Sequence, residues 1–206
     1  MICPEFRHFW RGVENADSVV FNPHKWLGAN FDCSAHFLRD PDSLVRTLAI
    51  RPEFLKTHGR DGVIDYSEWS VPLGRRFRAL KIWFLLRAYG LEHLRGMIRN
   101  HVRWSERLAK RLAAVPGFRI ATGPMLSLFS FRHEPKHVGD LDDHNLRLLN
   151  AINDDGRLYL TQTKLDGQSV IRFQAGSFDM TEADADTAFD VIVEIAQRLA
   201  SKGAAA

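Results

Sequence analysis

The 206-residue sequence has little cysteine and no long hydrophobic run. Its two cysteines, Cys3 and Cys33, do not form a Cys-x-x-Cys pair, which argues against a disulfide framework or a structural zinc site and suits a reducing compartment such as the cytoplasm. We find no apolar run of about 18 residues and no charged leader before an apolar stretch. We therefore expect neither a membrane span nor a signal peptide.

An excess of one charge is also missing. The chain carries 28 basic and 25 acidic side chains, a net charge of +3, so we expect no nucleic-acid partner. Its nine histidines form no His-Glu-x-x-His or similar cluster, and we expect no metal site. With 45% hydrophobic residues, the chain is long and apolar enough to bury a substantial core.

The stretch with the clearest chemical potential surrounds Lys25. This lysine lies among Phe21, Trp26, Leu27 and Phe31. Partial desolvation by such neighbours favours the neutral, nucleophilic amine, which can form a Schiff base. The alternative is an ordinary surface lysine, because lysine is seldom buried without a partner.

The surroundings of Lys25 are typical of a turn between two strands. Residues 18–21 are apolar and β-branched, and residues 34–38 alternate with period two. Asn22-Pro23 indicates a turn after the first of these strands. Ligands of open α/β sheets bind at strand ends, so this is a suitable position for a reactive lysine.

Several motifs resemble one enzyme family. Residues 22–26 (NPHKW) and 30–35 (NFDCSA) resemble the lysine segment of the group II pyridoxal-phosphate decarboxylases, most closely the aromatic-L-amino-acid decarboxylase branch. Residues 2–7 (ICPEFR), 16–18 (ADS) and 71–78 (VPLGRRFR) are similar to other segments of that family. Beyond about residue 150 the resemblance depends on pattern alone.

The resemblance implies an α/β and α+β fold. Residues 1–90 would form the C-terminal part of the large domain of a fold type I pyridoxal-phosphate enzyme, carrying the lysine turn and a mobile loop. Residues 91–115 would form a linking helix, and residues 116–206 a small C-terminal α+β domain. The family's phosphate-cradling segment, ring-stacking His and pyridinium-binding Asp would all precede Met1, so we expect a C-terminal fragment of a longer protein.

The resemblance also assigns roles to individual residues. Lys25 would bind pyridoxal 5'-phosphate covalently, Asn22 would offer its amide to the cofactor phosphate, and His24 would lie near the cofactor. Leu73 would approach the cofactor of the partner subunit in a homodimer. The alternatives are an ordinary turn asparagine and an ordinary surface histidine.

Residues 51–62 contain glycine and charge without periodicity, which predicts a mobile loop that covers the site. The resemblance implies a catalytic tyrosine in this loop, but an ungapped count from Lys25 places Phe54 there. A phenol can donate a proton to the carbon that loses carbon dioxide, whereas phenylalanine cannot.

Three functions remain open. The first is decarboxylation of an aromatic L-amino acid to its amine, a lyase reaction of amino acid and carboxylic acid metabolism, with His58, Tyr66 or water as the acid. The second, implied by the family's aldehyde-synthase branch, couples decarboxylation to oxidative deamination and gives an aromatic acetaldehyde. The third is a truncated, non-catalytic folding and dimerisation piece.

The rest of the amino-acid sequence predicts a series of helices and strands. Gly90 is expected to end one helix, and Pro116-Gly117 the next. We read the cations of residues 75–81 as a solvated or interfacial helix face. The expected helices cover residues 75–89, 91–115, 142–154 and 181–199, and the expected strands cover residues 118–121, 126–132, 159–163 and 170–174.

Overall fold

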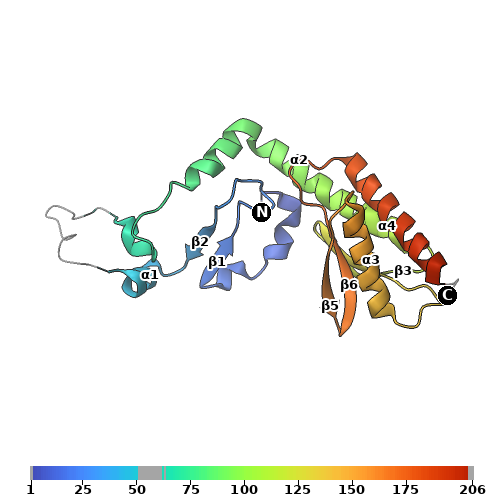
Figure 1. Ribbon diagram of the computed structural model, residues 1–206. Coiled ribbons are helices and arrows are strands. Elements are labelled where there is room, and N and C mark those ends of the chain that lie inside the picture. Colours follow the sequence, from blue (N-terminus) through green and yellow to red (C-terminus); the bar gives the residue numbers. More distant parts are fainter. Residues whose placement is uncertain (1, 51–61, 63, 204–206) are drawn as a thin grey trace. The chain divides into compact units, whose positions relative to one another are not determined.

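The computed structural model describes residues 2–50, 62 and 64–203. It divides into two compact units, Met1–Leu91 and Glu92–Ala206, which we call the first and second units (Figure 1). Each is described by itself. Within the described ranges, no helix is both long and apolar enough to cross a membrane.

The first unit is built around a two-stranded antiparallel ribbon. Strand β1 (Ser18–Phe21) pairs with β2 (Ala35–Leu38), with Phe21 opposite Ala35 at the end of the ladder. These strands confirm the prediction from sequence. The other elements among the described residues of this unit are η1 (Pro4–Trp10), η2 (Val13–Asn15), α1 (Pro41–Leu48), η4 (Tyr66–Trp69) and the beginning of α2 (Ala79–Ala113).

Helix α2 is interrupted at Gly90, as the sequence predicts. Gly90 has φ 76° and ψ 164°, a backbone conformation that glycine adopts far more readily than other residues. The helix begins at Ala79 and not at Arg75 as expected. We attribute this late start to Arg76 and Arg78, whose side chains bind Asp32 and hold the preceding segment outside the helix.

The second unit contains a four-stranded antiparallel sheet. Its strands are β3 (Phe118–Met125), β4 (Leu128–His133), β5 (Thr161–Leu165) and β6 (Gln168–Gln174), in the order β3-β4-β6-β5. Asp166 and Gly167, both with positive φ, form the two-residue turn between β5 and β6. This tight turn explains why β5 ends two residues later than expected and β6 begins two residues earlier. Strand β5 also begins two residues later than expected.

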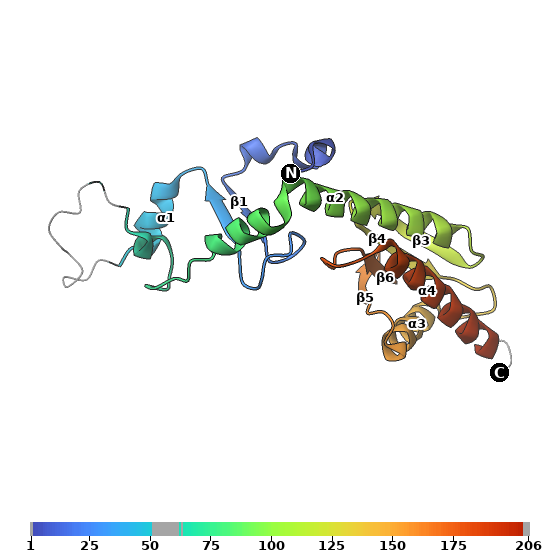
Figure 2. The ribbon, with the colours of Figure 1, turned by 90° about the horizontal axis from the view of Figure 1, so that it is seen from above.

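Helices α3 (Leu141–Asp155) and α4 (Glu182–Gly203) complete the second unit and lie near each other (Figures 1 and 2). Both are found where the sequence predicts them, although α4 continues four residues further. Asp140 caps α3, because its side chain accepts hydrogen bonds from the backbone N–H groups of Asp142 and Asp143.

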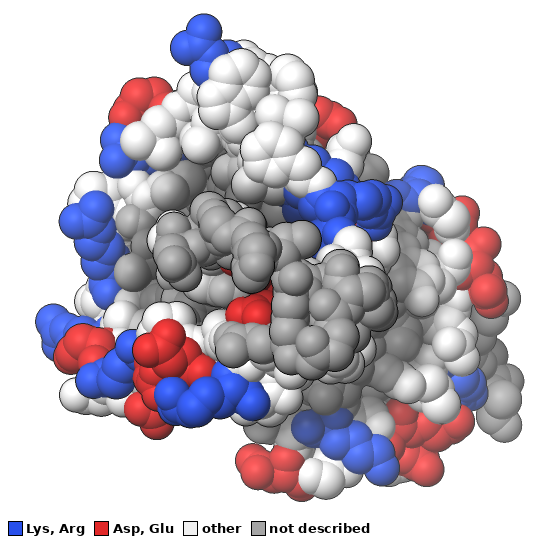
Figure 3. All heavy atoms as spheres, turned by 90° about the vertical axis from the view of Figure 1, so that its left-hand side faces the viewer, with Lys and Arg blue, Asp and Glu red and all other residues white. Residues whose placement is uncertain are grey.

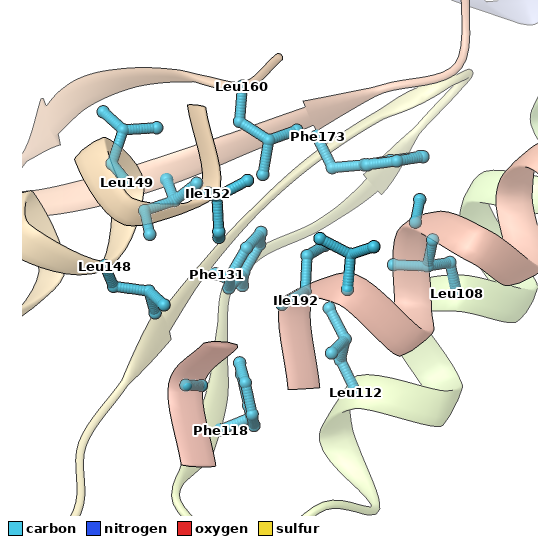
Figure 4. Close-up of a cluster of buried hydrophobic side chains, with 14 of the residues drawn as sticks. Leu108, Leu112, Phe118, Phe131, Leu148, Leu149, Ile152, Leu160, Phe173 and Ile192 are labelled. Atoms are coloured by element: carbon cyan, nitrogen blue, oxygen red, sulfur yellow. The ribbon is translucent and has the colours of Figure 1, made fainter. Parts of the chain in front are cut away.

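The hydrophobic core of the second unit lies between one face of the sheet and three helices (Figure 4). Phe129 and Phe131 alternate with polar residues along β4, so both point to the same side. Fully burying one such side chain contributes about 1.5–3 kcal/mol. Helices α2, α3 and α4 supply further members of the cluster, including Leu108, Leu112, Leu148, Ile152, Ile192 and Ile195.

A buried histidine pair lies beside this core. His133 Nδ1 is 2.9 Å from His144 Nε2, and the His133 ring packs on Phe118 with 4.6 Å between centroids. Burial lowers the pKa of His133 to about 4, with a further contribution from the neighbouring His144 and His137. Burial also lowers the pKa of His144, so the native pair is uncharged at neutral pH.

Candidate functional site

Lys25 lies on a turn that the two strands of the ribbon hold at both ends. The Lys25 backbone N–H donates to the Asn22 carbonyl at 3.0 Å, which closes a four-residue β-turn with Pro23 at its second position. A second bond, from Gly28 N to the Lys25 carbonyl at 3.0 Å, closes the next turn. The fixed φ of Pro23 favours the first turn, so the Asn-Pro signal and the structure agree.

The described residues leave the Lys25 side chain exposed. Phe31, expected to help desolvate it, is itself 82% exposed. The expectation of a partly desolvated lysine is therefore wrong for this chain. Apolar neighbours along the chain do not guarantee burial, because Phe31 and other neighbours can themselves be exposed.

His24 is fixed by the backbone of Cys33. Its Nδ1 lies 2.5 Å from the Cys33 carbonyl oxygen and 3.0 Å from the Cys33 nitrogen. The ring of Phe31 packs edge-on against it, with 5.0 Å between centroids. These contacts determine the orientation of the imidazole, which is half-buried one residue before Lys25.

Asn22 faces Ser34 across the base of the lysine turn. The Ser34 hydroxyl donates to Asn22 Oδ1 at 2.5 Å. Sequence reasoning did not single out Ser34, although it belongs to the NFDCSA motif. Its place as the first residue of the second predicted strand, residues 34–38, across the turn from Asn22, was the signal that could have found it.

Four charged residues hold the far side of the turn, and we call Asp32, Arg76, Arg78 and Lys81 the Asp32 clamp. Arg76 Nη2 donates to Asp32 Oδ1 at 2.5 Å, while Arg78 Nε and Nη2 donate to Oδ2 at 3.0 and 2.9 Å. The hydrogen bond from Arg78 is the main cause that lowers the pKa of Asp32 to about 2. Asp32 is therefore ionised throughout the physiological range.

Lys81 completes the clamp from helix α2. Its ammonium donates to three consecutive carbonyl oxygens, those of Asn30, Phe31 and Asp32, at 3.2, 3.1 and 3.1 Å. The sequence predicted that the cations of residues 75–81 form a solvated or interfacial helix face. In the structure, three of these cations, Arg76, Arg78 and Lys81, instead bind the loop that carries Lys25. On the face in Figure 3, basic and acidic side chains are interspersed.

The other expected site residues do not join the turn in the described structure. Leu73 is 65% exposed on the segment before α2. A cavity of about 380 Å³ next to this segment is lined by Asp32, Ser34, Ser70, Pro72, Gly74, Arg75, Arg76 and Arg78. Phe54 and His58 fall outside the described residues, as does the expected loop except for Gly62. Among the residues described, no group of three or more His, Cys, Asp or Glu side chains is arranged to hold a metal ion.

Comparison with known sequences places this turn in a family. Residues 1–134 match the pyridoxal-dependent decarboxylase conserved domain. The chain therefore belongs to the pyridoxal-dependent decarboxylase family. The match includes the lysine turn, the Asp32 clamp and all of helix α2.

Two relatives are similar over nearly the whole of this chain. The chain is 40% identical to a phenylacetaldehyde synthase of Arabidopsis thaliana over 98% of its own length and 42% of the relative's. It is 37% identical to tryptophan decarboxylase 2 of Oryza sativa subsp. japonica, again over 98% of this chain and 41% of the relative. The chain thus spans about two fifths of the length of these curated relatives.

A solved structure has a similar fold. The crystal structure of Oryza sativa TDC with PLP and tryptamine superposes with a TM-score of 0.90 and 32% identity, over 96% of this chain and 42% of that one. This likeness confirms the α/β and α+β fold class expected for part of a fold type I enzyme.

Proposed function

We propose that the protein containing this chain is a pyridoxal-phosphate-dependent decarboxylase that converts an aromatic L-amino acid to its amine and carbon dioxide. The observation that carries the proposal is the lysine turn, which presents an accessible Lys25 amine beside Asn22 and His24 on a rigidly held backbone. The relatives named as a tryptophan decarboxylase and as a protein crystallised with PLP and tryptamine support it.

The residues present fit this cofactor. When bound, pyridoxal phosphate accepts the electron pair left on the substrate's α-carbon after carbon dioxide leaves. Lys25 would hold the cofactor through its amine, and the Asn22 amide would donate to the phosphate. His24, whose Nδ1 is occupied by Cys33, would present the other side of its ring to the site.

The assignment of Lys25 is tested by the Lys25→Ala variant of the complete protein. After borohydride reduction with the cofactor, the wild type should yield a cofactor-linked peptide containing Lys25, and the variant none. The fold should be retained, because an exposed turn lysine contributes little packing. Lys110→Ala, which changes an exposed lysine of the second unit, serves as the control. A cofactor-linked peptide from Lys25→Ala would refute the assignment.

A second candidate is the oxidative reaction that yields an aromatic acetaldehyde. The observation favouring it is Phe54 at the position implied for the family's catalytic tyrosine, together with 40% identity to a phenylacetaldehyde synthase. Without a phenol at this position, protonation of the α-carbon is slower, and dissolved oxygen can compete for it.

Oxygen uptake measured against carbon dioxide release separates the two reactions. An aldehyde synthase consumes oxygen and releases ammonia and peroxide, and Phe54→Tyr should shift its product toward amine. Phe37→Tyr, which changes an exposed phenylalanine of β2, is the matched control. No oxygen consumption by the wild type, with amine as the sole product, would exclude this candidate.

We further propose that the complete protein is a homodimer in the cytoplasm, with Leu73 directed toward the partner subunit's cofactor. Exposed apolar side chains on the first part of α2 support the dimer, among them Trp83, Phe84 and Leu86. A chain with two cysteines, Cys3 and Cys33, in no Cys-x-x-Cys pair suits a reducing compartment. Light scattering of the complete protein at micromolar concentration would contradict the dimer if it gave a monodisperse monomer.

We expect the 206-residue chain alone to be inactive, because among its described residues we assign only Lys25, Asn22 and His24 to hold the cofactor. A cofactor joined to Lys25 absorbs visible light. Mixing the isolated chain with excess pyridoxal phosphate should therefore leave it colourless, and a coloured, borohydride-sensitive chain would show that it binds the cofactor unaided.

A further inference from the structure

Asn22 and Ser34 occupy matching positions just beyond the β1–β2 ladder. The last pair in the ladder is Phe21 opposite Ala35. Asn22 follows Phe21 and Ser34 precedes Ala35, so these two residues would form the next pair. Side chains directly opposite each other in an antiparallel ribbon lie close enough for a hydrogen bond. The contact is thus produced by the register of the ribbon.

The Asn22 amide meets Ser34 with its oxygen end. The Ser34 hydroxyl donates to Asn22 Oδ1 at 2.5 Å. An amide has one oxygen acceptor and one nitrogen with two N–H donors. With the oxygen bound to Ser34, the amide nitrogen faces away from Ser34.

We propose that Ser34 is a positioning residue that orients the Asn22 amide for the cofactor phosphate. This inference rests on the proposed function. A phosphate at neutral pH offers mainly acceptor oxygens, so it needs the N–H end of the amide. Without the Ser34 hydroxyl the amide can rotate by half a turn, and its carbonyl oxygen would then face the anion and repel it.

The test compares two ligands in the apo form of the complete protein. Pyridoxal phosphate and pyridoxal differ only in the phosphate, so a residue acting through Asn22 should affect the binding of the first alone. We expect Ser34→Ala to weaken pyridoxal phosphate binding about three- to tenfold, the range of one ordinary hydrogen bond. Asn22→Ala should weaken it about ten- to a hundredfold, as expected for a bond to a charged group.

Three further variants make the test specific. The double variant Ser34→Ala/Asn22→Ala should bind no more weakly than Asn22→Ala, because Ser34 has nothing left to orient. Ser34→Thr keeps a hydroxyl and should restore binding. Ser70→Ala, which removes another hydroxyl from the same cavity wall, should bind as the wild type does, since Ser70 bonds to the Pro72 carbonyl.

Equal weakening of pyridoxal and pyridoxal phosphate by Ser34→Ala would overturn the inference, as would additive effects in the double variant or unchanged binding. These outcomes differ from a failure of the proposed function, in which the wild-type protein itself would bind neither ligand.

Discussion

The two units of the chain are stabilised by different forces. Among the described residues of the first unit, the buried hydrophobic side chains are Cys3, Ala29, Cys33 and Leu85. Its lysine turn is held mainly by backbone hydrogen bonds and the Asp32 clamp. The second unit instead contains a continuous core from a sheet and three helices.

The exposed surfaces show the same difference. In the first unit, Phe37 is 59% exposed on a ribbon strand and Trp83 is 54% exposed on α2. Large apolar side chains clustered at a protein surface usually mark a contact with other protein. The first unit, which carries the candidate site, holds its lysine turn by local hydrogen bonds but leaves apolar side chains for other protein to cover. The second unit buries its apolar side chains in its own core.

We expect the largest effect when the two units are produced separately. We expect residues 92–206 alone to fold and to unfold cooperatively in urea, because their core is internal. Residues 1–91 alone should show no cooperative transition, because they bury too little apolar surface. Circular dichroism against urea concentration measures both. A cooperative first unit would break the comparison.

A core truncation should have the next largest effect. Phe131 is fully buried in β4, so Phe131→Ala should lower the free energy of unfolding of residues 92–206 by about 3–5 kcal/mol. In the complete protein, the matched variant Phe37→Ala should also lower stability, because we expect further protein to cover this ring, which is 59% exposed in the present chain. No loss from Phe37→Ala would show that the ribbon face stays uncovered and would contradict the comparison.

Acid should weaken the second unit before it reaches the range where the carboxylates titrate. The folded-state pKa of His133 is about 4, below its ordinary value of about 6.5, so the unfolded chain binds more protons between these values. Stability contributed by the neutral histidine is therefore lost as the pH falls. We expect a loss of about 2 kcal/mol between pH 7.5 and 5.

Urea unfolding of residues 92–206 at several pH values measures this loss. His144 and His101, whose pKa values burial also lowers, act in the same direction. His133→Phe keeps a ring against Phe118 but cannot titrate, so it should flatten the pH dependence. An unchanged slope in that variant would mean that His133 is not a source of it.

The smallest effect concerns the Asp32 clamp. Lys81→Met removes three hydrogen bonds to the carbonyls of residues 30–32, in a partly exposed setting. We expect local opening of this loop to become easier by about 1 kcal/mol, or roughly fivefold faster amide exchange there, with global stability little changed. Lys110→Met should leave exchange at residues 30–33 unaltered. If Lys81→Met leaves amide exchange at residues 30–33 unchanged, Asp32, Arg76 and Arg78 hold the loop in place without Lys81.

Local sequence signals predicted much of the fold. The Asn22-Pro23 turn, the strands around it and the break at Gly90 depend on backbone preferences of a few adjacent residues, and the structure confirms them. The start of α2 was missed because it depends on Asp32, more than 40 residues earlier.

The candidate site was predictable to a similar extent. The motif placed Asn22, His24 and Lys25 together, and the structure puts them on one turn. The supporting contacts of Ser34 and Lys81 were not predicted, since they follow from strand register and from the approach of a distant helix. Their roles and that of Phe54 stay predictions.

The Asp32 clamp also has a consequence for how the chain tolerates changes in length. Its bond between Asp32 and Arg76 joins residues 44 positions apart, so it closes a large loop at its base. Loop-closure entropy grows only with the logarithm of length, and doubling such a loop costs about 0.6 kcal/mol. Insertions and deletions between β2 and η4 should thus leave the lysine turn in place.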